Sequence, residues 1–167
     1  MLVNEFIKRV SVRLGDEARI TYSSKELISC LNDAISQLSL ERIAAHDPLM
    51  IKEITVTPGR TSVPAGFVRF VGQEPFYIDG AKFASLDGST EKRTARCYVA
   101  KAHVESAGDD LPFDDATSLG ALMDYVVVLA GARVGYASQV ESTLADRMSG
   151  AYTGRSASDA GAVAKES

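Results

Sequence analysis

The stretch SSKELISCLNDAISQLSLER, residues 23–42, predicts the longest helix of the chain. Ser23 followed by Glu26 fits a capping box, in which each side chain accepts the backbone amide of the other residue. At about 100° per residue, one stripe collects six apolar side chains: Leu27, Ile28, Leu31, Ala34, Ile35 and Leu38. The opposite face is polar until its last turn, which brings Leu40 and Ile43. We therefore expect a core helix that makes a second contact, with another module or subunit, through Leu40 and Ile43.

Apolar side chains recur at helical spacing in three further stretches. The first starts at Leu2 and stops at Gly15, a residue type that commonly ends helices. The second follows Pro112 and carries a wide apolar face as far as Val134. The third covers residues 138–152 and has one apolar stripe. Together with the long helix, these stretches predict an antiparallel helical bundle of about four helices.

After Pro48 the apolar residues alternate with polar ones, which is typical of strands. Short strand-like runs follow one another as far as residue 105, and prolines and glycines separate them. Asp79-Gly80 lies between two such runs and predicts a two-residue hairpin turn. This part of the sequence predicts a small, mostly antiparallel β-module.

These patterns predict an α+β protein with a discontinuous helical unit. The helical bundle is expected to combine residues 1–48 and 112–152, with residues 49–111 inserted as the β-rich module. Residues 153–167 consist mainly of Gly, Ala, Ser and Asp. Because such a composition buries too little apolar surface to fold alone, we expect an extended C-terminal arm.

Composition narrows the classes of function. Apolar residues make up 46% and charged residues 24%, as in ordinary globular domains. The net charge of -4 argues against a whole-chain nucleic-acid binder, because such binders neutralise phosphates with excess Lys and Arg. The apolar runs are shorter than the roughly 20 residues that span a bilayer. The two cysteines, Cys30 and Cys97, are far apart and are interpreted as reduced thiols of a cytosolic product.

Residue types that carry catalysis or bind metals are sparse and badly spaced. The two histidines, His46 and His103, do not fit a ligand spacing such as H-x-x-x-H. The acidic group Asp109, Asp110, Asp114 and Asp115 lacks the spacing and terminal Glu of a calcium loop. The chain contains neither a phosphate-binding P-loop nor a dinucleotide fingerprint. We expect no enzyme, no metal and no cofactor; a small enzyme or metal protein using these residues is the alternative from another class.

The order of helix, long helix, β-module, two helices and small-residue tail resembles the head-to-tail adaptor (connector) proteins of tailed bacteriophages. The matching segments are Phe6-Ile7-Lys8-Arg9-Val10, Glu26-Leu27, Leu31-Asn32-Asp33-Ala34-Ile35, Leu122-Met123-Asp124-Tyr125-Val126 and Tyr136-Ala137-Ser138-Gln139. The resemblance covers nearly the whole chain and is one of layout and pattern.

The resemblance implies a structural virion protein, assembled in the cytoplasm of the host bacterium and located in the neck of the virion. Such proteins form a ring, usually a dodecamer, that docks under the portal protein, extends the DNA channel and supports the next neck or tail protein. DNA then passes through the lumen without sequence-specific binding, and a lumen of like charge avoids adhesion. The arm is the candidate portal-binding segment, through Gly154, Arg155, Ala157, Gly161, Val163 and Lys165. A tail-completion or stopper protein, and a small helical interaction module unrelated to phage, are the alternatives.

Overall fold

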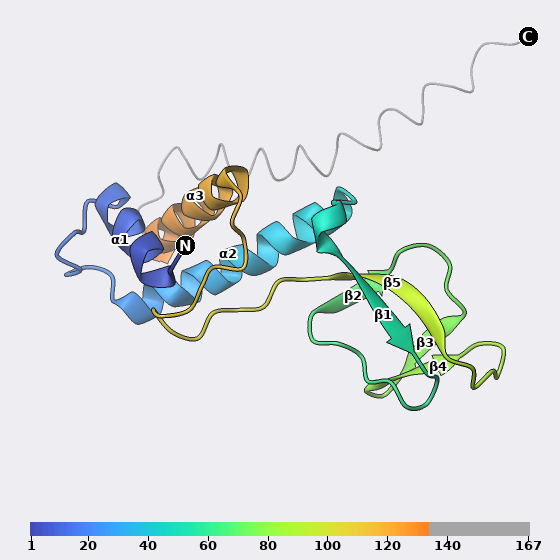
Figure 1. The fold of residues 1–167 in the computed structure, drawn as a ribbon. Coiled ribbons are helices and arrows are strands. Elements are labelled where there is room, and N and C mark those ends of the chain that lie inside the picture. Colours follow the sequence, from blue (N-terminus) through green and yellow to red (C-terminus); the bar gives the residue numbers. More distant parts are fainter. Residues whose placement is uncertain (134–167) are drawn as a thin grey trace, which may run out of the picture.

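The computed structural model describes residues 1–133. In this range the chain forms three α-helices, one short 3-10 helix and five strands in two small antiparallel sheets (Figure 1). The helices are α1 (Val3–Arg13), α2 (Ser24–Ala44) and α3 (Ala116–Arg133), and the 3-10 turn is η1 (Pro48–Met50). The strands are β1 (Ile51–Val56), β2 (Phe67–Phe70), β3 (Phe76–Asp79), β4 (Lys82–Ser85) and β5 (Arg93–Val99).

The ends of the helices follow local chemistry that the sequence predicts. The capping box of α2 is present, with the amide of Glu26 3.2 Å from Ser23 Oγ and the amide of Ser23 2.8 Å from Glu26 Oε2. Asp115 caps α3 by accepting the amide of Ser118 at 2.8 Å. Gly15 follows α1 with a φ of 68°, a left-handed conformation that glycine adopts without strain. These contacts satisfy backbone groups that a helix end leaves without a partner inside the helix.

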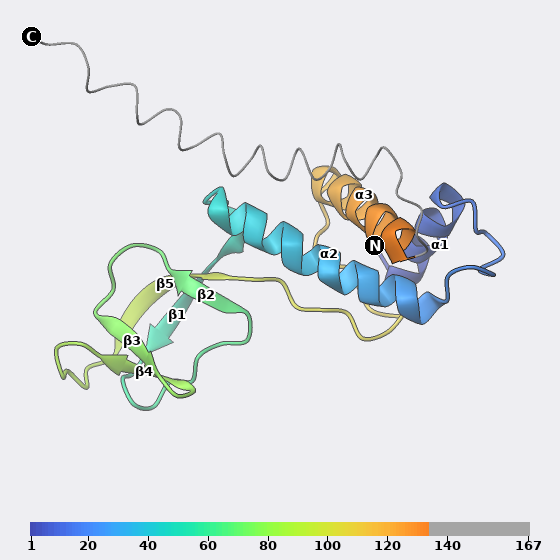
Figure 2. The same cartoon turned by 180° about the vertical axis from the view of Figure 1, so that it is seen from behind.

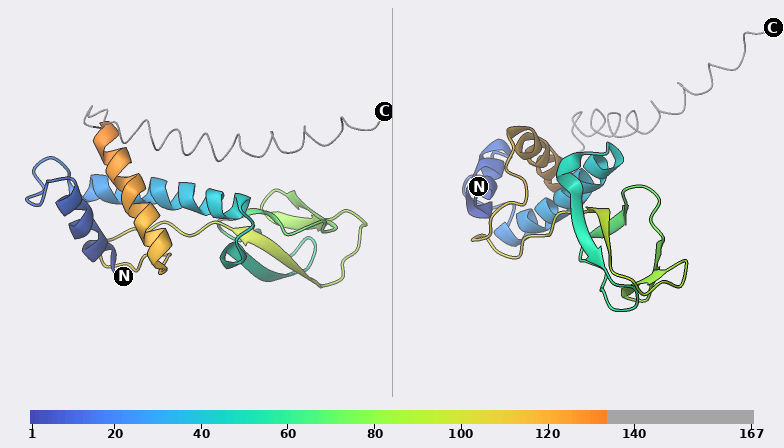
Figure 3. Two further views of the ribbon diagram at one scale, coloured as in Figure 1. Left: turned by 90° about the horizontal axis from the view of Figure 1, so that it is seen from above. Right: turned by 45° about the vertical axis from the view of Figure 1, so that its right-hand side comes forward.

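The larger core lies along α2, from Leu27 to Ile43, where α1 and α3 pack against this helix (Figure 3). All but one of the apolar residues expected on the stripe of α2 are buried, and Ile28 is half-buried. Phe6 and Val10 of α1 and Leu122 and Val126 of α3 lie in the same core with 0% exposure. The segment between β5 and α3 also packs there, through Val104, Leu111 and Phe113.

The prediction of an antiparallel four-helix bundle is wrong. The described residues contain three helices and two small sheets, and the stripe of α2 is buried by α1, α3 and the segment between β5 and α3. The C-terminal end of α2 is covered by the β-module as well as by α3, since Met50 and Tyr98 belong to the same core as Ile43 and the Tyr125 hydroxyl of α3 donates to Glu41. The helix expected at residues 138–152 lies outside the described residues.

The β-module consists of a three-stranded sheet, ordered β1-β5-β2, and the hairpin β3-β4. Val56, Ala95, Phe76 and Phe83 form a second core between them, with Phe67 and Phe70 packed against it. The hairpin turn is displaced by one residue from its expected place, because Asp79 pairs with Lys82 and the turn residues are Gly80 and Ala81. Gly80 has a φ of 59°, so the glycine in the predicted dipeptide still makes the turn possible.

The larger core runs along α2 from Leu27 to Ile43, and the second core lies within the β-module, beyond the C-terminal end of α2 (Figures 1 and 2). Helix α2 has 21 residues, which gives it a length of about 30 Å. Helix α1 lies near its first half, α3 runs along it from Ser29, which Arg133 contacts, to Glu41, which Tyr125 contacts, and the strands lie beyond its last turn. The described part of the molecule is therefore elongated.

Candidate functional site

Leu40 and Ile43, the candidate contact pair of α2, do not lie in one surface. The side chain of Ile43 is 3% exposed and belongs to the larger core, whereas that of Leu40 is 52% exposed. The backbone of Ile43 also takes part in the joint to the β-module, where its carbonyl lies 3.4 Å from the Arg69 guanidinium. Leu40 is left as an exposed apolar residue near the end of α2. The arm residues Gly154, Arg155, Ala157, Gly161, Val163 and Lys165 lie outside the described residues.

Three polar or aromatic side chains that the sequence did not single out together form the joint between α2 and the β-module. Tyr98 of β5 is 4% exposed, and its hydroxyl lies 3.1 Å from Nδ1 of His46. The guanidinium of Arg69 stacks over the Tyr98 ring at 5.1 Å from its centroid, a favourable cation–π arrangement. His46 holds a left-handed backbone conformation with a φ of 59°, which turns the chain sharply after α2.

A second cluster, centred on Arg42, connects the end of α2 to the start of α3. Its guanidinium lies 3.1 Å from Asp47 and 3.1 Å from Asp115, and it covers the ring of Phe113 at 5.4 Å. The hydrogen bonds from the Ser118 hydroxyl and amide, with the nearby positive charge of Arg42, hold the pKa of Asp115 below its usual value. The arrangement fits a structural clamp between the two segments that flank the β-module.

The residues considered for metal or acid–base chemistry are dispersed. His103 Nε2 lies 2.7 Å from Ser36 Oγ, while His46 contacts Tyr98 at the joint. Asp109 accepts the amides of Ser106 and Glu105, and these hydrogen bonds lower its pKa, so it serves its own loop. Within residues 1–133, no group of three or more His, Cys, Asp or Glu is placed to hold a metal ion.

Both cysteines lie inside the protein. Cys30 on α2 and Cys97 on β5 are free thiols with 1% and 0% exposure. Burial raises the pKa of both thiols, because a low-dielectric surrounding disfavours the thiolate. Neither side chain is accessible to a substrate, so their role is packing.

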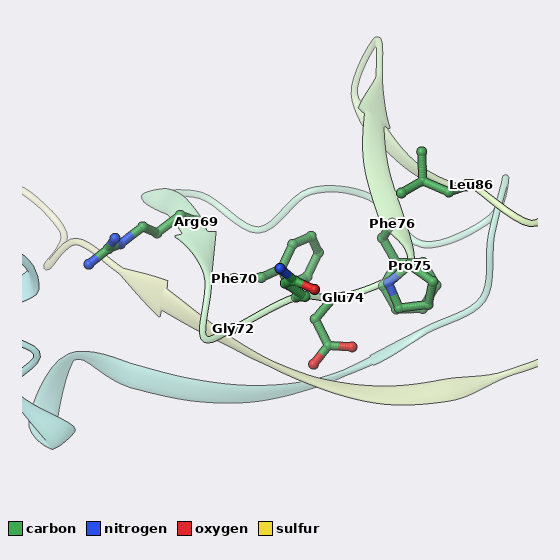
Figure 4. Close-up of a pocket in the computed structure, with 8 residues that line it drawn as sticks. Arg69, Phe70, Gly72, Glu74, Pro75, Phe76 and Leu86 are labelled. Atoms are coloured by element: carbon green, nitrogen blue, oxygen red, sulfur yellow. The ribbon is translucent and has the colours of Figure 1, made fainter.

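An open groove of about 860 Å³ lies on the β-module beside β3 (Figure 4). Its lining includes the apolar side chains of Phe70, Pro75, Phe76 and Leu86 together with Glu74 and Arg69, whose guanidinium points away toward Tyr98. The groove has the size of ligand pockets, which measure about 300–1,000 Å³. It contains neither a cluster of titratable groups nor a nucleophile among its lining residues, so its chemistry suits an apolar side chain.

Exposed apolar side chains occur at both ends of the molecule. At the helical end Ile20 is 87% exposed, in the loop between α1 and α2. On the β-module Leu86 is 69% exposed, and Tyr77 and Ile78 of β3 are about half exposed. The sequence signal for Ile20 is a large aliphatic residue in the short loop between the two predicted helices, next to polar Arg19 and Thr21.

Comparison of the chain with protein-family models, curated proteins and solved structures gives no significant match. Within the described range, none of the helices has the length and apolar character needed to cross a membrane.

Proposed function

We propose that this chain is a structural subunit of the head-to-tail adaptor ring of a tailed bacteriophage. In this role it docks under the portal protein, extends the DNA channel and supports the next neck or tail protein. The observation that supports the proposal best is the presence of two separate cores, one along α2 and one within the β-module, each with exposed apolar side chains nearby. The resemblance of the sequence pattern to adaptor proteins points to the same role.

An elongated subunit with different surfaces at its two ends suits a ring. A subunit in a cyclic assembly contacts one neighbour through one surface and the other neighbour through a different one. A helical end and a β-module, each presenting apolar side chains, provide two such surfaces. The proposed role is mechanical and requires neither a catalytic residue nor a cofactor.

The test is attachment to purified capsids that carry the portal protein but lack the adaptor. We expect the full chain to sediment with these capsids and to appear as a ring below the portal in electron micrographs. Capsids without portal are the control and should bind none of it. A chain that ignores the portal but attaches to preformed adaptor rings would be a stopper or tail-completion protein, and one that attaches to neither would refute the phage proposal.

The candidate arm is tested in the same assay. Removing residues 153–167 should weaken attachment to portal-bearing capsids and leave the melting temperature of the free chain unchanged. The composition of this segment, mostly small and polar residues, motivates the expectation. Attachment at full affinity after truncation would show that residues 153–167 are not the portal-binding arm.

A further inference from the structure

The loop between α1 and α2 holds an isoleucine out into solvent. The Asp16 carboxylate accepts three successive backbone amides, from Ile20 at 2.9 Å, Thr21 at 3.1 Å and Tyr22 at 2.8 Å. Arg19 adopts a left-handed φ of 53° and its guanidinium donates to Ser24 Oγ at 2.9 Å. These contacts fix the loop, and the side chain of Ile20 between them is 87% exposed.

A single exposed apolar residue is common on protein surfaces and needs no explanation by itself. Ile20 differs because a carboxylate with 8% exposure organises the backbone on which it is presented. A group held in one conformation before binding loses less entropy when it docks. The Ile20 loop thus has the properties of a pre-formed apolar anchor.

The groove beside β3 is an equally well-formed receptor. Its floor is held by aromatic contacts, with the Phe70 ring 5.9 Å from that of Phe76 and 5.3 Å from that of Phe83. The backbone amide of Leu86 donates to the carbonyl of Pro75 at 2.9 Å, which fixes one wall. Figure 4 shows Leu86, Pro75 and Phe76 on one side of this groove and Phe70 on another.

The two surfaces are complementary in charge. Arg19 directly precedes Ile20 in the sequence and Glu74 lines the groove, so the loop carries a basic group and the groove an acidic one beside the apolar centre. Over the larger regions, residues 51–99 have a net charge of +2, from seven Lys and Arg against five Asp and Glu. The other described residues have a net charge of -5, from eight Lys and Arg against thirteen Asp and Glu.

We propose that the Ile20 loop of one copy docks into the β3 groove of a second copy of this chain. The loop follows α1 at the far end of the helical unit and the groove lies on the β-module, at opposite ends of α2 (Figure 1). A loop and a groove so far apart meet only between molecules, and such a head-to-tail contact leaves one free loop and one free groove for further copies. The inference rests on the proposed ring function, since it specifies the contact between neighbouring subunits.

The contact is tested with two exposed substitutions, Ile20→Asp and Leu86→Asp, in the full chain. Each places a charge in the proposed apolar contact, where it would be buried without a partner. Sedimentation equilibrium should show self-association of the wild type. For each variant, the dissociation constant of this self-association should be at least about tenfold larger. Leu49→Asp, at a position that is 66% exposed and outside both surfaces, is the matched control and should associate as the wild type does. Circular dichroism melting checks that all three variants fold.

Mixing the two variants gives the sharpest result. Ile20→Asp keeps an intact groove and Leu86→Asp keeps an intact loop, so an equimolar mixture should form a dimer of one copy of each and nothing larger. A mixture that stays monomeric, or an Ile20→Asp variant that associates like the wild type, overturns the inference.

The capsid assay separates this inference from the proposed function. If both variants attach to portal-bearing capsids as rings with wild-type affinity, the adaptor role stands and the loop-in-groove contact is refuted. If the wild type neither self-associates nor attaches to portals, the proposed function fails, and the inference that rests on it fails too.

Discussion

Asp16 shows how one side chain sets the conformation of a whole loop. Burial alone raises the pKa of its carboxyl, but hydrogen bonds from the amides of Tyr22, Thr21 and Ile20 outweigh burial and hold the pKa below its usual value. The ionised form is therefore the one that the folded loop prefers. Without it, three amides next to the start of α2 would lose their acceptor.

The pH dependence of stability follows from this shift. A carboxyl whose pKa is lower in the folded state stabilises the protein above its unfolded pKa, about 3.9, and loses that contribution as the pH falls through the folded value. Asp16→Asn should therefore lower the urea midpoint at pH 7. The decrease of the midpoint between about pH 5 and pH 2 should be smaller in this variant than in the wild type. Glu17→Gln, at an exposed neighbouring position, should leave the pH 7 midpoint unchanged. An Asp16→Asn midpoint equal to that of the wild type at pH 7 would mean that the carboxylate does not stabilise the fold.

Residues of the joint could not be found from the sequence, because their partners are distant along the chain. Arg69 reaches the carbonyl of Ile43, 26 residues away, and His46 meets Tyr98, 52 residues away. Helical periodicity placed Leu40 and Ile43 together, since it describes one helix in isolation. Which of the two is buried depends on where the β-module settles, and this is a property of the tertiary fold.

Among the elements, α2 is the one whose sequence specifies it most completely. Its cap, its apolar stripe and its length are all local signals, and the structure agrees with each. Ser23→Ala removes the acceptor for the amide of Glu26 and should lower the free energy of unfolding by about 1 kcal/mol. Ser23→Asp, which keeps an N-cap acceptor, is the control and should retain most of the stability. Denaturation by urea measures the free energy of unfolding of both variants. An unchanged free energy for Ser23→Ala would show that the stability of the helix does not depend on this cap.

The stripe of α2 gives a larger expected effect. Leu31 is 0% exposed within the larger core, so Leu31→Ala should cost about 2–5 kcal/mol by loss of burial and formation of a cavity. Lys25→Ala changes an exposed position on the same helix and should alter stability by less than about 0.5 kcal/mol. Equal urea midpoints for the two variants would show that the buried stripe of α2 has been assigned to the wrong face of the helix.

The strands were less predictable than the helices. Strand β5 begins at Arg93 because this residue pairs with Val56 of β1, a partner that lies far away in the sequence. The strand-like stretch around Val63 makes only an isolated bridge, between Ser62 and Lys82. Alternation identifies the residues that suit a sheet, whereas the pairing of distant strands decides where each strand begins and ends.

At the scale of the whole molecule, the insertion of strands between α2 and α3 produces two cores instead of one bundle. Periodicity within each segment predicted the helices, but it contains no information on which element covers the end of α2. The β-module takes that place through Met50 and Tyr98. The predicted four-helix arrangement was wrong for this reason, while the helical segments within residues 1–133 were recognised correctly.

The core along α2 and the core within the β-module should unfold separately. Phe83 is 0% exposed and its ring lies 5.3 Å from those of Phe67 and Phe70, so Phe83→Ala should cost the β-module about 3–5 kcal/mol. At 1.4 kcal/mol per factor of ten, the amides of β3 and β4 should exchange with solvent deuterium at least about 100-fold faster. Amides in the first half of α2 should keep their protection, because that half packs against α1 and α3.

Leu31→Ala is the reciprocal variant, and it should accelerate exchange in α2 while leaving β3 and β4 protected. If either variant accelerates exchange equally in both regions, the two cores form a single cooperative unit.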